Sequence, residues 1–235
     1  DVPIETLIGN VQHFIMSDNH DKDDGLACGQ HICSIYRTKV EQFSVLTPFL
    51  IDALKNKQKC ICAVEESTKS EISRIIREKG LSPEKCSQWG QLSLFIQKEA
   101  YLRGGYFTAE KMIELIKRFQ RQALSEGFSG LRITGEMTGD LMNMIGSHDL
   151  IKYEVMVNYF YPNSDVYLLC QYDESQFSKE ILLDVVHTHP KIFLYGRLVD
   201  NPYHHPPDIF LKPKRKETPA HTYEVMVGEL LKKII

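Results

Sequence analysis

The stretch GQHICSIYRTKVEQF, residues 29–43, contains a continuously apolar run that leads directly into a segment with helical spacing. The run HICSIY (31–36) predicts a buried strand, because strands covered on both faces are apolar at nearly every position. From Lys39 onward, apolar residues recur three and four positions apart, which predicts a helix. A buried strand followed by a helix is the unit of parallel sheets, since two parallel strands need a crossover connection. This stretch therefore predicts an α/β fold.

The same alternation continues through most of the chain. Further apolar runs predict strands at 60–65, 92–97, 131–136, 166–172 and 192–199. Helical spacing predicts helices at 39–58, 67–80 and 108–127, and the last two end in glycine, a frequent C-terminal cap. Because the strands are apolar throughout and alternate with helices, the sequence predicts a doubly wound, mainly parallel sheet with helices on both faces.

The limits of this alternation predict the domain organisation. Residues 29–210 are expected to form one domain, preceded by an N-terminal extension (1–28) and followed by a basic loop and a final helix (211–235). In the final helix an apolar stripe recurs at spacings of four, three and four residues, at Tyr223, Val227, Leu230 and Ile234. Such a stripe indicates either a helix that packs back on the domain or one that forms a homodimer or passes on a signal.

The composition excludes several classes of protein. The 235 residues, 43% of them hydrophobic, are sufficient to bury a large core. With 28 basic against 31 acidic residues, the chain as a whole has no attraction for nucleic acid or an anionic membrane. No apolar run approaches the roughly 20 residues that cross a bilayer, and the start DVPIETLIGN lacks the pattern of a signal peptide. We therefore expect a cytoplasmic protein with reduced, buried cysteines.

Polar side chains follow several of the predicted strands. Tyr36 and Arg37 follow the first strand, Glu136 ends the fourth, and Tyr172 and Asp173 end the fifth. In open parallel sheets, ligands bind outside the carboxyl ends of the strands. These side chains therefore predict the rim of a binding pocket at that edge of the sheet.

A histidine and a cysteine lie two positions apart in the first strand. His31 and Cys33 are expected to point to the same face, because side chains alternate along a strand. His187 and His189, in the motif HTHP, add two imidazoles at the end of a helix. One interpretation is a metal-type or haem-type site built from these four residues. The other is that they fill the core, since buried cysteine behaves as a small hydrophobe.

The turn after the first strand bears on nucleotide binding. A P-loop needs glycine amides and a lysine followed by serine or threonine, whereas YRTKVEQF has no glycine and Lys39 precedes valine. Glu136, in LRITGEM, resembles the acidic end of a Walker B strand. One half of an ATPase site without the other argues against ATP hydrolysis. A residual nucleotide binder that uses Lys39 and the strand-end carboxylates stays an alternative.

Several segments of the chain resemble, in the same order, the motifs of a known protein family. They are GQHICSIYRTKVEQF with PFLIDALKNKQKCICAVEE, then GGYFTAEKM, ALSEGFSGLRITGEM, YEVMVN, LLCQYD, and HTHPKI with NPYHHPP. Together these segments resemble the MEDS family, the methanogen/methylotroph, DcmR-type sensory domain. The resemblance implies a RecA-like three-layer α/β/α fold with a degenerate P-loop. It also implies a non-catalytic sensor of a small molecule, such as a one-carbon or hydrocarbon-derived compound, that is coupled to a histidine kinase or a DNA-binding regulator.

The motif positions and the strand ends together define the expected ligand-binding residues: His31, Cys33, Tyr36, Arg37, Glu136, Tyr172, Asp173 and His189. No catalytic residue and no obligatory cofactor are expected. The final helix is the expected output, because a ligand transmits a signal only when it favours one arrangement of the protein over another.

Overall fold

The computed structural model describes residues 29–102, 106–210 and 219–233. The predicted N-terminal extension (1–28) and the basic loop (211–218) lie outside the described residues, so nothing is concluded about them.

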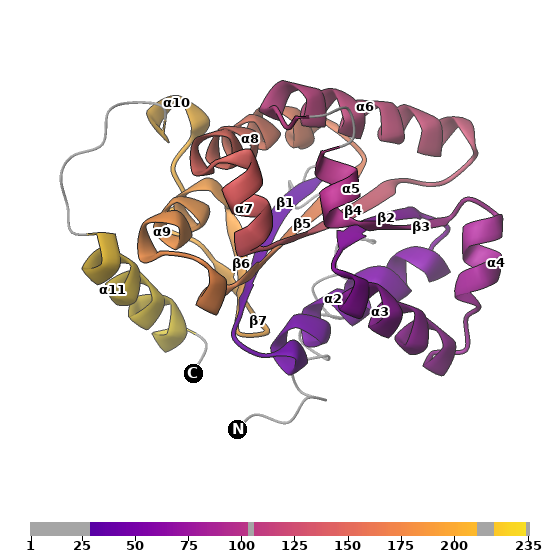
Figure 1. Cartoon of the computed structure of the whole chain (residues 1–235), viewed down its shortest axis with the longest axis horizontal. Helices are drawn as coiled ribbons and strands as arrows, with labels where there is room; N and C mark the ends of the chain where they lie inside the picture. Colours follow the sequence, from indigo (N-terminus) through magenta and orange to yellow (C-terminus); the bar gives the residue numbers. More distant parts are fainter. Residues whose placement is uncertain (1–28, 103–105, 211–218, 234–235) are drawn as a thin grey trace, which may run out of the picture.

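A seven-stranded sheet forms the centre of the molecule, with its strands in the order β3-β2-β4-β5-β1-β6-β7 (Figure 1). The strands are β1 (Gln30–Tyr36), β2 (Lys59–Val64), β3 (Leu92–Ile96), β4 (Leu131–Met137), β5 (Val166–Asp173), β6 (Lys191–Leu194) and β7 (Arg197–Asp200). Every pairing is parallel except that between β6 and β7. The predicted mainly parallel sheet is therefore confirmed.

Helices cover both faces of this sheet, as predicted. They are α2 (Lys39–Lys55), α3 (Glu66–Glu78), α4 (Pro83–Gln88), α5 (Gln97–Tyr101), α6 (Ala109–Ser125), α7 (Gly139–Ile145), α8 (Ser147–Phe160), α9 (Lys179–Thr188), α10 (Pro207–Phe210) and α11 (Pro219–Lys232). Two 3₁₀ turns, η1 (Tyr161–Asn163) and η2 (Glu174–Gln176), flank β5. In Figure 1, α2, α3 and α4 lie on one side of the sheet, and α6, α8, α9 and α11 lie on the other.

The alternation of side chains in the strands decides which residues can meet. Cys33 packs in the core beneath α6, α8 and α9, whereas its neighbour Ile32 packs in the core beneath α2 and α3. His31 shares the face of Cys33, as predicted, and contacts α8. Cys60 and Cys62 belong to the core beneath α2 and α3, so they cannot join His31 in one site.

The start of α2 closes the turn after β1 without any glycine. The Thr38 side chain accepts a hydrogen bond from the Glu41 amide, and the Glu41 carboxylate accepts one from the Thr38 amide, which is a capping box. This turn has the conformation of a helix cap made by side chains, so it offers no nest of free amides to a phosphate.

Two parts of the predicted element order were wrong. The predicted strand 192–199 is a hairpin of β6 and β7, because Tyr195 (φ 50°) and Gly196 (φ 82°) form a two-residue turn with positive φ. In addition, no helix was predicted between residues 138 and 165, where α7 and α8 lie. Helix α8 has no simple polar face, because it is buried against both the sheet and α6.

The final helix packs on the domain. Tyr223, Val227 and Leu230, three members of the predicted apolar stripe, are buried where α11 lies against α9. Ile234 lies outside the described residues. Within the described parts of the chain, no helix is long and apolar enough to cross a membrane.

A close contact between β4 and α5 gives a first prediction. A methyl group added at Gly135 would overlap the hydroxyl oxygen of Tyr101, a buried side chain. We expect Gly135→Ala to lower the free energy of unfolding by about 1–3 kcal/mol, as overpacking of a core does. In a Tyr101→Phe background the cost should be much smaller, because the Tyr101 ring carbon Cζ lies 3.4 Å from the added methyl group. Urea unfolding of the four proteins measures this; equal costs in both backgrounds would contradict the contact.

Candidate functional site

The structure distributes most of the predicted ligand-binding residues among three clusters, each named here for its central carboxylate. The Glu136 cluster consists of Glu136, Tyr36, Lys39, Gln42 and Thr68. The Glu174 cluster consists of Glu174, Arg37, Lys179, Tyr195 and Tyr223. The Glu154 cluster consists of Glu154, His31, Cys170, Tyr172 and His189. Asp173 belongs to none of them, since its carboxylate caps η2 at the Ser175 amide, 3.0 Å away.

The Glu136 cluster lies at the carboxyl edge of the sheet, where the pocket rim was predicted. Glu136 is only 1% exposed, and its carboxylate accepts hydrogen bonds from several neighbouring segments. The donors are the Tyr36 hydroxyl at 3.4 Å, Lys39 Nζ at 3.1 Å, Gln42 Nε2 at 3.0 Å, Thr68 Oγ1 at 3.1 Å and the Glu65 amide at 2.9 Å. The carboxylate is thus satisfied by the protein itself. Lys39 Nζ is paired with this carboxylate, which offsets the positive charge that a phosphate would need.

A groove of about 520 Å³ begins beside this cluster and runs between α2 and α3. Lys39 and Thr68 line one end of it, and Glu71, Arg74 and Ile75 line its α3 side. No glycine is among the described residues that line it. The groove therefore lacks the backbone cradle on which nucleotide phosphates depend.

The Glu174 cluster joins the carboxyl edge of the sheet to α11. The Glu174 carboxylate accepts hydrogen bonds from Arg37 Nε at 2.5 Å, from the Tyr195 hydroxyl at 3.1 Å and from the Tyr223 hydroxyl at 3.2 Å. Burial by itself would raise the pKa of Glu174, but the hydrogen bond and charge of Arg37 outweigh burial and hold the pKa below its usual range. An ionised Glu174 therefore ties α11, through Tyr223, to the ends of β1 and β6.

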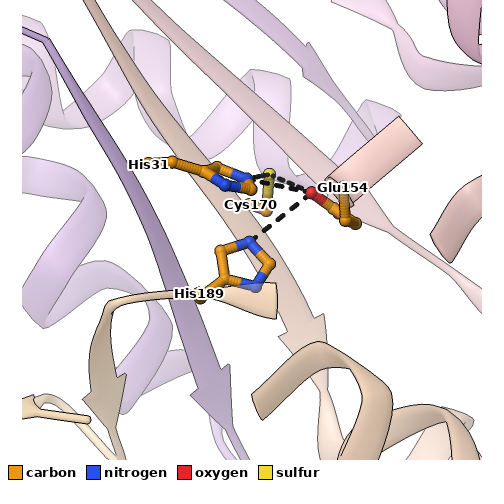
Figure 2. Close-up of side chains that lie close together, drawn as sticks. All are labelled: His31, Glu154, Cys170 and His189. Carbon is orange, nitrogen blue, oxygen red and sulfur yellow. Dashed lines mark hydrogen bonds and ion pairs between the residues drawn. The ribbon is translucent and has the colours of Figure 1, made fainter. Parts of the chain in front are cut away.

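The Glu154 cluster lies in the core between the sheet and two helices (Figure 2). Glu154 comes from α8, His31 from β1, Cys170 from β5, and His189 from the residue after α9. Glu154 Oε2 lies 3.0 Å from His31 Nε2, 3.5 Å from His189 Nε2 and 3.6 Å from Cys170 Sγ. None of the four side chains is more than 3% exposed. Three potential metal ligands from separate elements thus converge on one carboxylate oxygen.

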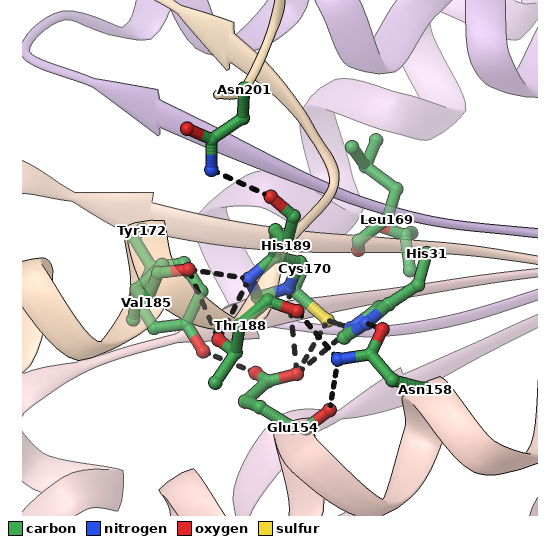
Figure 3. A network of polar contacts seen from close by, with 11 residues as sticks. His31, Glu154, Asn158, Leu169, Cys170, Tyr172, Val185, Thr188, His189 and Asn201 are labelled. Atoms are coloured by element: carbon green, nitrogen blue, oxygen red, sulfur yellow. Dashed lines mark hydrogen bonds and ion pairs between the residues drawn. The ribbon is translucent and has the colours of Figure 1, made fainter. Parts of the chain in front are cut away.

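Further contacts fix the orientation of both imidazoles (Figure 3). Asn158 Nδ2 donates to the Thr188 carbonyl at 2.6 Å, so the Asn158 side-chain oxygen is left to accept from His31 Nδ1 at 3.0 Å. His189 Nδ1 donates to the Val185 carbonyl at 2.8 Å. Both rings therefore carry a proton on Nδ1 and turn Nε2 towards Glu154. The Tyr172 hydroxyl donates to the other carboxylate oxygen of Glu154.

The protonation states in this cluster follow from burial and charge. Burial, with a smaller contribution from His31, lowers the pKa of His189 to about 3, so this ring is neutral. Burial would raise the pKa of Glu154, but its contacts with His31 and the Tyr172 hydroxyl oppose burial and hold this pKa below its usual value. Burial and the Glu154 charge raise the pKa of Cys170, so this thiol keeps its proton in the protein alone.

Sequence reasoning found three of the five members of this cluster, His31, Tyr172 and His189. Of the predicted metal ligands, His31 and His189 meet in it. Cys33 lies beside the cluster as the register partner of Cys170, and His187 instead stacks on His205 with ring centroids 4.2 Å apart. Glu154 and Cys170 lie in the family's motifs YEVMVN and LLCQYD but were not among the expected ligand-binding residues, although a carboxylate within the apolar run YEVMV is a signal for a buried functional group.

Comparisons with known proteins show which family the chain belongs to. Residues 30–190 match the family described as MEDS, MEthanogen/methylotroph, DcmR Sensory domain. The match covers more than half of the chain, so the chain belongs to this family of sensory domains. Membership gives it a sensory and regulatory role.

A curated relative and a solved structure are similar to the chain. The transcriptional repressor DcmR of Methylorubrum extorquens is 25% identical over 174 residues, which are 72% of this chain and 62% of the repressor. The chain therefore spans less than two thirds of that protein. The crystal structure of the uncharacterized protein PH0321 from Pyrococcus horikoshii, in complex with an unknown peptide, is 12% identical with a TM-score of 0.51. The matched region covers 70% of this chain and 76% of the PH0321 chain, and this similarity supports only the fold.

Proposed function

We propose that this domain binds a small, mainly apolar organic molecule and passes the binding event to a DNA-binding regulator through α11, without catalysis. The single observation that carries the proposal is an apolar cavity of about 360 Å³ beneath α6. Apolar cavities of this size with a few polar groups are the usual binding sites of small molecules. The proposed site thus lies on one face of the sheet, since the groups at the carboxyl edge are satisfied by one another.

The cavity lies between the sheet and helices α5 and α6. Ile61 on β2 and Ile133 on β4 form part of its floor, and Met112 on α6 lies opposite them. Tyr101 and Tyr153 bring the two hydroxyl groups that line it. Apolar side chains would supply most of the affinity by burying the ligand, and these hydroxyls would orient a polar group on it. This combination suits a one-carbon or short hydrocarbon derivative better than a charged nucleotide.

The polar end of the cavity adjoins the Glu154 cluster. Tyr153 precedes Glu154 on α8, and its ring packs edge to face on Phe107 with centroids 6.0 Å apart. Burial raises the pKa values of Tyr101 and Tyr153, and the charge of Glu154 contributes to both increases. A ligand that reaches the two hydroxyls would therefore be sensed by α8 and by the cluster that anchors α8 to the sheet.

A continuous series of packed helices leads from the cavity to α11. Helix α6 packs against α8, α8 packs against α9, and α9 packs against α11 (Figure 1). The Glu174 cluster then ties α11 to the sheet. A ligand that displaces Tyr153 would shift α8 and α9, and so change how α11 docks. The similarity to a transcriptional repressor supports a DNA-binding regulator as the partner, which would place the domain in the cytoplasm.

We further infer that this sheet descends from a RecA-like nucleotide-binding domain whose P-loop has degenerated. The parallel sheet and the strand-end carboxylate Glu136 support this origin. The side-chain cap at Thr38 and the engagement of Lys39 by Glu136 support the loss of phosphate binding.

Filling the cavity tests the proposed function. We expect Met112→Trp to occupy the space above Ile61 and Ile133 and to abolish ligand binding. The measurement is a thermal-shift screen of short alcohols, amines, thiols and hydrocarbons, followed by calorimetry of the compounds that stabilise the protein.

Leu124→Trp is the matched control, because Leu124 lies on the same helix but is 45% exposed and does not line the cavity. At least one compound should bind the wild type and Leu124→Trp with equal affinity and Met112→Trp at least tenfold more weakly. Equal binding to all three proteins would place the ligand elsewhere and refute the proposal.

A further inference from the structure

The Glu154 cluster has the spacing of the ligands around a bound metal ion. Each of four residues, His31, Glu154, Cys170 and His189, offers one ligand atom, and these atoms all lie within 4.8 Å of one another. In a tetrahedral zinc site with bonds of about 2.0–2.3 Å, neighbouring ligand atoms are about 3.3–3.7 Å apart. The separations of His189 Nε2 and Cys170 Sγ from Glu154 Oε2, and of Cys170 Sγ from His31 Nε2, are 3.5, 3.6 and 3.7 Å. The separation of His31 Nε2 from Glu154 Oε2, 3.0 Å, needs only a small adjustment.

The surroundings of the two imidazoles also match those of metal ligands. A histidine that binds a metal through Nε2 donates its Nδ1 proton to a carbonyl or carboxylate, which fixes the ring. Here His31 Nδ1 faces the Asn158 side-chain oxygen and His189 Nδ1 faces the Val185 carbonyl. Both Nε2 atoms are thereby turned towards Glu154 Oε2, and Figure 2 shows these contacts.

Protons alone do not satisfy this arrangement. A proton shared by His31 and Glu154 and the thiol proton of Cys170 account for two of the contacts with Glu154 Oε2. The third, His189 Nε2, is fully buried and has no hydrogen-bond partner among the described residues. With its proton on Nδ1, this ring presents a lone pair to a carboxylate oxygen 3.5 Å away, which is unfavourable without a cation between them.

We propose that His31, Glu154, Cys170 and His189 bind one divalent first-row transition metal ion, Zn²⁺ being the best match to two imidazoles, a carboxylate and a thiolate. Binding releases the Cys170 proton, and the carboxylate and thiolate then neutralise the charge of the ion. The four ligands leave no open position, and none is exposed, so the ion is structural and is taken up as the chain folds. The ion joins α8 and the end of α9 to β1 and β5, and its ligand Glu154 directly follows Tyr153 in α8.

The metal content of the purified full chain, expressed without a histidine tag, tests this site. Elemental mass spectrometry should find about one equivalent of zinc or a related ion in the wild type, retained after dialysis. Cys170→Ala should lower the metal affinity at least tenfold. Cys33→Ala is the matched control, because Cys33 is an equally buried thiol in register with Cys170 on the neighbouring strand, but is not one of the four ligands.

A second readout covers variants that fold poorly. Apo wild type titrated with Co²⁺ should develop the thiolate charge-transfer and visible bands of a tetrahedral site, and Cys33→Ala should do the same. His189→Ala, checked by circular dichroism, should give neither. A wild-type protein that binds neither Zn²⁺ nor Co²⁺ at equimolar concentrations would overturn the proposal, and so would full retention of metal by Cys170→Ala. Because these measurements use no organic ligand, their failure would leave the proposed cavity untouched.

Discussion

Replacing Glu136 by glutamine is expected to lower the free energy of unfolding by about 1–3 kcal/mol, the usual cost of leaving a buried polar group unsatisfied. The carboxylate is buried and accepts from five donors, one of them the Lys39 ammonium group. An amide nitrogen in place of one oxygen would face donors with another donor and leave them unsatisfied. Chemical denaturation followed by circular dichroism measures the change.

The control for this substitution lies at the same edge of the sheet. Glu66→Gln removes a carboxylate whose side chain is 71% exposed, and it should change the stability by less than about 0.5 kcal/mol. If Glu136→Gln were as mild as Glu66→Gln, the Glu136 carboxylate would not be the structural centre described here. It would then return as a candidate for ligand binding, the role predicted from the sequence.

Replacing Glu174 by glutamine is expected to speed hydrogen exchange of the α11 amides by roughly 10- to 100-fold. Hydrogen bonds to a charged group contribute about 1.5–3 kcal/mol, and Glu174 supplies the acceptor that binds the Tyr223 hydroxyl to the sheet edge. The sheet itself should keep its protection, because its central strands are held by their own parallel pairings. Glu224→Gln, at an exposed position of α11, should leave the exchange unchanged.

Acidification should act on α11 in the same direction. The pKa of Glu174 is lower in the folded protein than its ordinary value, so its contribution is complete above that ordinary value and is lost as the pH falls through the folded pKa. The protection factors of the α11 amides, which are exchange rates corrected for the intrinsic effect of pH on amide exchange, should therefore fall in acid in the wild type. In Glu174→Gln this acid-dependent loss of protection should be missing; an identical pH profile of the protection factors would contradict the role of the Glu174 cluster.

The sequence was sufficient to predict the sheet, because its strands are buried on both faces and therefore apolar throughout. Burial also explains why α7 and α8 were not predicted, since α8 has no exposed face long enough to give a clear polar stripe. Tyr195 and Gly196 could have revealed the β6–β7 hairpin, but a short turn inside an apolar run resembles a longer strand.

The site was predictable only in part, for a topological reason. The two-residue spacing of His31 and Cys33 correctly placed both on one face of the sheet. It could not show that Cys170, on the neighbouring strand β5, would contact His31, or that Glu154 of α8 would contact it as well. Such contacts join residues more than 100 positions apart, and only the strand order brings them together.

The central claim is that a ligand beneath α6 alters the docking of α11. Hydrogen exchange of α11 (Pro219–Lys232), measured with and without the tightest-binding compound from the screen, tests it most directly. We predict that saturating compound protects the peptides of α5 and α6 and changes the exchange rate of α11 by at least threefold in the wild type but not in Met112→Trp. Protection beneath α6 with unaltered exchange in α11 would contradict the account.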